Sequence, residues 1–129
     1  GERLSPEFAA ASQRLRAAVA AEPMMVAGEE RFDTRLMRAL GGRVACKVGA
    51  EGVYAASLPE LGLGIAIKVD DGNPRAAEVA LAQIVRQLIS LSDTEAAALN
   101  SLAEPVLRNW RGVEVGRVAA TDALRAALR

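Results

Sequence analysis

Apolar residues in the first part of the chain recur at the spacing of an amphipathic helix. They are Leu4, Phe8, Ala11, Leu15 and Val19. Ser5 suits the N-cap of this helix and Pro6 its first position, whereas Pro23 interrupts the pattern. We therefore expect a helix that runs to about Glu22, followed by a short apolar connector over residues 24–28.

The pattern then passes from helical spacing to the alternation that is typical of strands. A second helix is predicted from near Thr34 to Leu40, and Gly41-Gly42 would end it. Beyond it, three strands are expected between short turns that contain glycine or proline: Arg43 to Val48, Gly52 to Leu58 and Leu63 to Val69. Short connections predict antiparallel neighbours.

Helices dominate the rest of the chain. A long helix is predicted from Pro74 to about Ser90, and its apolar face would cover the bulky face of the sheet. Ser92 and Glu95 form a capping-box pattern for another helix that ends near Glu104-Pro105. A short edge strand (Val113, Val115, Val118) and a last helical turn or two from Thr121 to Leu128 complete the pattern. The prediction is one α+β domain over residues 1–129, with a small antiparallel sheet packed against helices.

Composition narrows the classes of function. The chain of 129 residues carries 16 basic and 16 acidic side chains without blocks of like charge, so neither nucleic acid nor a membrane surface is an expected partner. It has no histidine, which excludes imidazole chemistry. Its single cysteine, Cys46, cannot form an intrachain disulfide. No apolar run has the length of a membrane span, and a cytoplasmic location is expected.

Strand alternation separates the side chains of the first strand into two faces. Cys46 falls on the bulky face and is expected to be a small buried hydrophobe rather than a nucleophile. Lys47 falls on the opposite face, among glycine and alanine residues, directly before Val48-Gly49. Lys47 is either a surface lysine at a strand end or a working residue that moves a proton or holds a carboxylate. Gly49 would let a substrate approach, and Glu51 would orient Lys47 or a substrate amine, or else be an ordinary turn residue.

Several ordered segments together resemble the bacterial L-asparaginase II family, the rhizobial-type asparaginases. These segments lie within residues 20–118: Arg31-Phe32-Asp33-Thr34-Arg35-Leu36-Met37-Arg38, Gly42 to Tyr54, Gly62 to Gly72, Arg75-Ala76, Pro105-Val106 and Asn109 to Gly116. The resemblance implies the C-terminal half of a fold like that of serine β-lactamases and penicillin-binding proteins. It also implies hydrolysis of L-asparagine to L-aspartate and ammonia in a bacterial cell.

The same resemblance places Lys47-Val48-Gly49 at the Lys-Thr-Gly strand motif of penicillin-recognising enzymes, which makes Lys47 a catalytic candidate. Gly49 and Glu51 become candidates for substrate binding. The family's Ser-x-x-Lys nucleophile motif does not occur in this sequence, because no serine has a lysine three positions later. We therefore expect the chain to be the C-terminal part of a longer asparaginase-like protein, or one half of a site that is completed by a complementary chain.

Asp33 departs from the family pattern. The resemblance implies that zinc-binding members of the family have a cysteine ligand at the matching position. In this sequence a carboxylate, which is a harder ligand than a thiolate, takes its place. Asp33 is accordingly a metal candidate, with zinc a candidate but not a required cofactor of the complete protein, or else the N-cap of the helix that begins at Thr34.

Two other functions stay open. The chain could be a non-catalytic interaction module, for example one that forms a homo-oligomer. An uncovered small-residue face and an open sheet edge both favour such association. It could also serve a glutaminase or another amidase of the same fold, since nothing in the residues measures the length of a substrate pocket.

Overall fold

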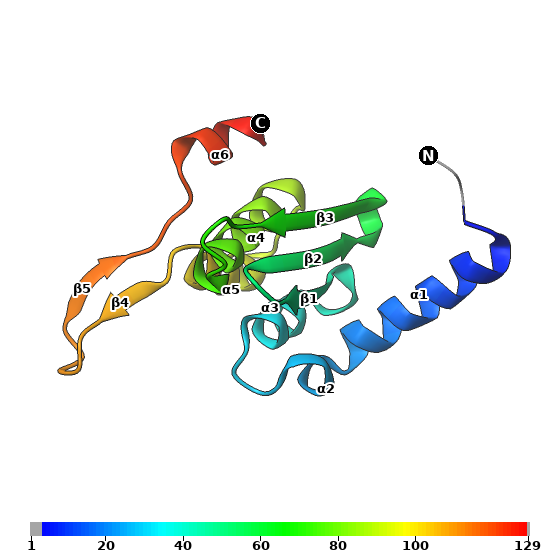
Figure 1. Ribbon diagram of the computed structural model, residues 1–129, viewed down its shortest axis with the longest axis horizontal. Coiled ribbons are helices and arrows are strands. Elements are labelled where there is room, and N and C mark those ends of the chain that lie inside the picture. Colours follow the sequence, from blue (N-terminus) through cyan, green and yellow to red (C-terminus); the bar gives the residue numbers. More distant parts are fainter. Residues whose placement is uncertain (1–3, 129) are drawn as a thin grey trace.

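A three-stranded antiparallel sheet forms the centre of the molecule in the computed structural model, which describes residues 4–128. The strands β1 (Ala45–Gly49), β2 (Val53–Leu58) and β3 (Leu63–Lys68) lie in the order β1-β2-β3 (Figure 1). Lys47 is paired with Ala55, and Ala55 with Ala66. The α+β class and the antiparallel pairing predicted from the short turns are confirmed.

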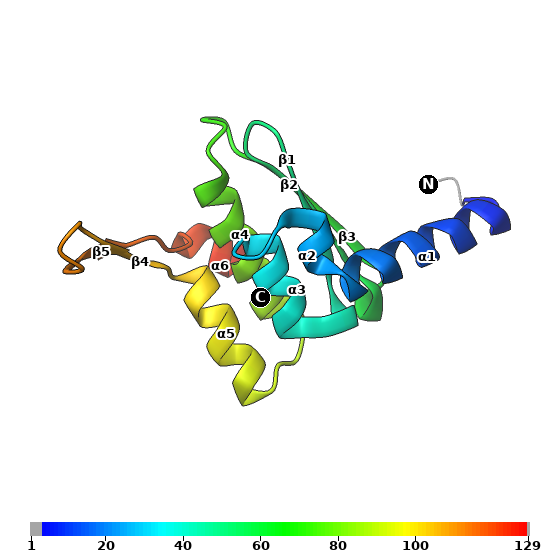
Figure 2. The same cartoon turned by 90° about the horizontal axis from the view of Figure 1, so that it is seen from below.

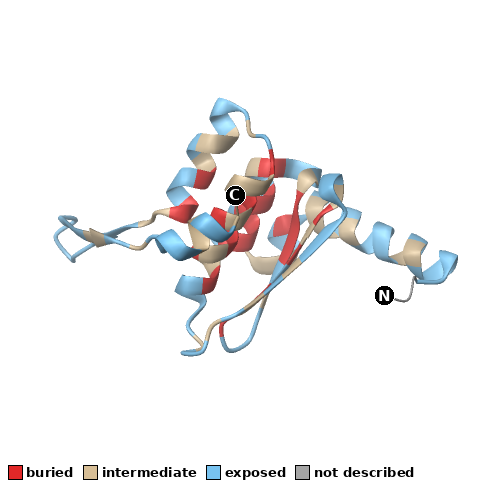
Figure 3. Cartoon of the chain, turned by 90° about the horizontal axis from the view of Figure 1, so that it is seen from above, coloured by how far each residue is buried: buried red, intermediate tan, exposed pale blue. Residues whose placement is uncertain are grey.

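Helices α3 (Phe32–Leu40) and α4 (Pro74–Leu88) cover one face of this sheet, and α5 (Asp93–Ala103) packs on both of these helices. Helix α4 packs against β2 and β3, while α3 packs against β1 and α5. The core lies between these helices and the sheet (Figure 3), where Leu36, Tyr54, Leu81 and Leu99 are fully buried. The covering helix predicted from Pro74 is thus confirmed, and its apolar face drives the packing.

Local signals set the N-terminal ends of α4 and α5. Asn73 caps α4 by accepting a hydrogen bond from the backbone N–H of Arg75 at 2.9 Å. Ser92 and Glu95 form the predicted capping box of α5. Each cap supplies an acceptor to N–H groups that the first helical turn leaves free.

The N-terminal region contains one more helix than the sequence predicts. Helix α1 (Pro6–Ala21) begins after its N-cap Ser5 as expected, but residues 24–28 are not a plain connector. A short helix, α2 (Pro23–Ala27), occupies this segment, because Pro23 fits the first position of a new helix and Gly28 ends it at a positive φ of 96°. None of the helices in residues 4–128 combines the length and apolar character needed to cross a membrane.

The starts of α3 and β1 each lie two residues from the predicted position. Helix α3 begins at Phe32 rather than Thr34, and its N-cap is Arg31, so the prediction of Asp33 as N-cap is wrong. The first strand starts at Ala45, because residues 41–43 form a 3₁₀ turn, η1, which leads out of the helix.

The C-terminal segment leaves the body as a separate hairpin. The strand predicted around Val115 is β5 (Glu114–Arg117), and it pairs with an unpredicted strand, β4 (Val106–Arg108), rather than with the main sheet. The hairpin projects at the opposite end of the molecule from α1 (Figures 1 and 2). The chain then returns toward α4 through α6 (Asp122–Ala127), the final helix predicted from Thr121.

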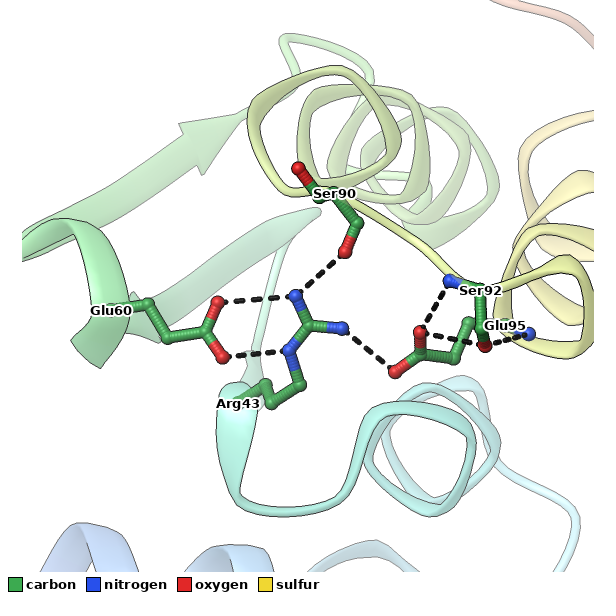
Figure 4. Close-up of polar contacts among 5 residues, drawn as sticks. All are labelled: Arg43, Glu60, Ser90, Ser92 and Glu95. Carbon is green, nitrogen blue, oxygen red and sulfur yellow. Dashed lines mark hydrogen bonds and ion pairs between the residues drawn. The ribbon is translucent and has the colours of Figure 1, made fainter.

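An arginine clasp joins three loops at one end of the core. Arg43 donates two hydrogen bonds to the carboxylate of Glu60, at 2.7 and 3.1 Å, and a third to Glu95 at 2.8 Å. It also donates to the backbone carbonyl of Ser90 at 2.7 Å (Figure 4). The planar guanidinium suits this arrangement because it offers several donors in fixed directions.

Candidate active site

Lys47 lies on the sheet face that α3 and α4 do not cover. Register and alternation place it among small neighbours, with Ala45 on its own strand, Ala55 opposite it and Ala66 one strand further. The side chain is exposed, and its ammonium donates to the backbone carbonyl of Val48 at 2.7 Å. Within residues 4–128 the Lys47 ammonium has no ion pair with a carboxylate. Its charge therefore needs no structural partner and is free to meet a ligand.

A mostly apolar cleft of about 310 Å³ opens beside Lys47. Helix α1 forms one wall and residues of β1 and β2 form the other. The residues that line it are Leu15, Arg16, Val19, Ala45, Cys46, Lys47, Ala55, Ala56 and Ser57. Ser57 was not singled out from the sequence, although it stands on the same face as Lys47, diagonally across β2. Strand alternation combined with the register would have found it.

The two predicted substrate-binding residues, Gly49 and Glu51, lie at the end of β1 and in the turn that follows it. A side chain at Gly49 would crowd Val53 on β2, because an added Cβ would lie 3.0 Å from the Cβ of Val53. Glu51 adopts a left-handed backbone with φ 58°, and its carboxylate lies beside Gly72. No hydrogen bond or ion pair joins Glu51 to Lys47 in the described part of the chain, while Lys68 donates to the Glu51 carbonyl at 2.8 Å. A role of either residue in substrate binding remains a prediction.

Asp33 is fully buried in the first turn of α3, behind β1. One carboxylate oxygen accepts the backbone N–H of Val48 at 2.8 Å, and the other accepts the hydroxyl of Tyr54 at 3.0 Å. The strand edge explains the first contact, because an outward N–H of β1 has no further strand to donate to. Asp33 thereby fixes the strand at the residue next to Lys47.

These hydrogen bonds leave the Asp33 carboxylate little capacity to bind a metal ion. Both oxygens of Asp33 already accept hydrogen bonds from protein donors. Among residues 4–128 there is also no group of three or more His, Cys, Asp or Glu side chains that could hold a metal ion. The described residues do not fit the zinc site that the family resemblance implies, and no step of the chemistry below passes through a metal.

Tyr54 and Glu78 complete a buried polar network that sequence reasoning missed. The Tyr54 hydroxyl also lies 3.2 Å from the carboxylate of Glu78 on α4. Burial raises the pKa of Tyr54, and the nearby negative charge of Asp33 adds to the effect. Burial likewise raises the pKa of Glu78, against the hydrogen bond from Tyr54. An inward-facing tyrosine on a strand was the available signal, since a buried phenol needs a polar partner.

Cys46 is buried on the covered side of the sheet, as predicted. Its thiol points to the backbone carbonyl of Asp33 with a sulfur-to-oxygen distance of 3.9 Å. Burial, followed by the charge of Asp33, raises the pKa of this thiol to about 12. A thiol that is buried and protonated does not act as a nucleophile.

The α+β fold, the uncovered sheet face and the exposed strand lysine define a domain that is open on one side. The family model of L-asparaginase II matches residues 2–120 of this sequence, and the chain belongs to that family. Comparison with curated proteins found no match. Membership supports an asparaginase-type hydrolase function in general, and it confirms the family resemblance drawn from the ordered motifs.

Proposed function

We propose that this chain supplies Lys47 to an active site that hydrolyses the side-chain amide of L-asparagine to L-aspartate and ammonia. The observation that carries the proposal is the position of Lys47, exposed beside an open cleft on a small-residue face, in a chain of the L-asparaginase II family.

The reaction needs a nucleophile that this sequence does not contain in the Ser-x-x-Lys form. We propose that polypeptide outside residues 1–129, either covalently joined or a complementary chain, carries that motif and packs on the uncovered face. The nucleophilic oxygen adds to the side-chain amide carbon, the carbon–nitrogen bond breaks, and nitrogen leaves as ammonia after gaining a proton. Water then releases aspartate and regenerates the nucleophile.

Lys47 has two chemically reasonable roles in this scheme. As an ammonium it would hold the substrate carboxylate, and as a neutral amine it would pass a proton between the nucleophile and the leaving nitrogen. Asp33 would act as a positioning residue, because it fixes the backbone next to Lys47 without reaching the open face. The apolar cleft would contact the substrate's carbon skeleton.

The test is ammonia release from L-asparagine by the chain assembled with its nucleophile-bearing half. Lys47→Ala should lower kcat by about 100-fold or more, the scale of a lost acid–base group. Lys68→Ala is the matched control, because Lys68 is the other lysine of the chain and lies on the same face. Equal activity in both variants would remove Lys47 from the mechanism. Parallel assays with L-glutamine would separate an asparaginase from a glutaminase or a broader amidase.

A non-catalytic interaction module is the second candidate. The observation that favours it is the apolar stripe of α1, where Phe8 and Leu15 are each 69% exposed and no residue of the helix is buried. Intact-mass analysis with light scattering of the purified protein separates the two functions. A second polypeptide that carries Ser-x-x-Lys supports the enzyme, whereas a homo-oligomer of this chain alone without amidase activity supports the module.

A further inference from the structure

A second hollow lies on the helical side of the sheet, away from Lys47. It has a volume of about 210 Å³ and forms where α3, α4 and α5 meet. Its apolar walls come from Phe32, Val79 and Leu102, which are all buried. Pockets for drug-sized ligands usually measure about 300–1,000 Å³, so this one suits a smaller molecule.

Three guanidinium groups line this pocket. Arg31 and Arg35 stand one helical turn apart at the start of α3, and Arg75 comes from the first turn of α4. None of the three forms a side-chain hydrogen bond or ion pair with any other residue in the range 4–128. Other arginines of the chain do have acidic partners: Arg43, Arg86, Arg117 and Arg125. Unpaired guanidinium groups that converge on one hollow are suited to bind carboxylates.

Two carboxylates, Glu30 and Glu78, also line the pocket, together with Ser101. Glu78 is half-buried, and one of its carboxylate oxygens lies 3.2 Å from the Tyr54 hydroxyl. Burial raises its pKa, while the charges of Arg31 and Arg35 act in the opposite direction. A bound cation would favour the ionised form of this carboxyl, so the pocket also offers a place for an ammonium group.

We infer that this pocket binds a small acidic amino acid, with its carboxylates on the arginines and its ammonium on Glu78. Three guanidinium groups against two carboxylates give the pocket a net charge of about +1 when the glutamates are ionised, which complements the net charge of an acidic amino acid. L-Aspartate, the product under the proposed function, belongs to this class. The binding itself does not require Lys47 and does not depend on that function.

Calorimetric titration of the chain with L-aspartate tests the site. We expect a dissociation constant of about 1 mM or lower. Arg35→Gln should weaken binding by about tenfold or more, since it removes a charge-assisted contact. Arg38→Gln is the matched control, because Arg38 is exposed on the same helix but does not line this pocket. Binding that is absent, or equally weakened in both variants, would overturn the inference.

Further measurements separate this pocket from the proposed active site. Lys47→Ala should leave the affinity for L-aspartate unchanged, and a large loss would place the binding at Lys47 instead and refute the inference. Glu78→Gln should weaken L-aspartate but not succinate, which has both carboxylates and lacks the ammonium. L-Asparagine, which lacks the second carboxylate, should bind more weakly than L-aspartate. Equal loss of succinate and L-aspartate in Glu78→Gln would contradict the assignment of the ammonium contact.

Discussion

Replacing Tyr54 by phenylalanine removes one oxygen atom from the buried network and leaves the ring in place. The ring packs edge-on against Phe32, with centroids 5.4 Å apart and planes at 77°, and this contact does not involve the hydroxyl. What the variant loses is the donor to the Asp33 carboxylate at 3.0 Å. Asp33 and Tyr54 are both fully buried, so water cannot replace that donor without opening the core.

A hydrogen bond to a charged group contributes about 1.5–3 kcal/mol, and we expect Tyr54→Phe to lower the free energy of unfolding by that amount. The contact to Glu78 adds little, because one hydroxyl hydrogen cannot fully serve two acceptors. Urea unfolding followed by far-ultraviolet circular dichroism measures the change. The midpoint should fall while the slope m stays constant, since the native surface is unaltered.

A double-mutant cycle assigns the loss to the right partner. In an Asp33→Ala background the hydroxyl has lost its main acceptor, so the further change Tyr54→Phe should cost at least about 1 kcal/mol less than in the wild type. Additive losses, or a Tyr54→Phe variant within about 0.5 kcal/mol of the wild type, would refute the reasoning, because surface-like substitutions already produce changes of that size.

Three more predictions concern the turn, the clasp and the thiol. Gly52→Ala should lower the free energy of unfolding by about 2–4 kcal/mol, because φ is +66° and the new Cβ would lie 2.5 Å from a side-chain carbon of Val69. Gly62→Ala, with a similar φ of +62° but open space around the new Cβ, should cost only about 1 kcal/mol. The midpoints of urea unfolding compare the two variants. Hydrogen bonds, first from the Ser92 backbone N–H and then from the arginine clasp, lower the pKa of Glu95 from 4.5 to about 2. Its stabilising contribution is therefore complete above about pH 4.5 and is lost as the pH falls toward 2, and Glu95→Gln should lose less stability on acidification than the wild type. Cys46, with a pKa of about 12, should resist iodoacetamide in the native state and react after unfolding, as mass spectrometry would show.

The parts of the fold that local chemistry determines could be predicted from the sequence. The capping box at Ser92 and the alternation of the three central strands need only neighbouring residues, and both are confirmed. Strand β4 was missed because three residues, 106–108, are too few to show alternation, and its existence depends on pairing with β5. Helix α2 was missed because Pro23 can end one helix and begin the next.

In the candidate site, too, features that depend on neighbouring residues could be predicted, whereas features that depend on tertiary packing could not. Alternation alone placed Lys47 and Cys46 on opposite faces, and the structure confirms this. The environment of Asp33 could not be predicted, because its partners, Val48 and Tyr54, are 15 and 21 residues away in the sequence. The N-cap role predicted for Asp33 rests on neighbouring residues alone. The burial of Asp33 behind the edge of β1 depends instead on how α3 packs against β1.

The exposed turn of the β4–β5 hairpin carries Trp110, the only tryptophan of the chain. Its indole is fully exposed and distant from the core, so its emission should already resemble that of free tryptophan in the native protein. Tryptophan fluorescence will therefore be nearly silent when the core unfolds. A blue shift of that emission would instead signal that another molecule has covered the hairpin, which makes Trp110 a built-in optical probe for association.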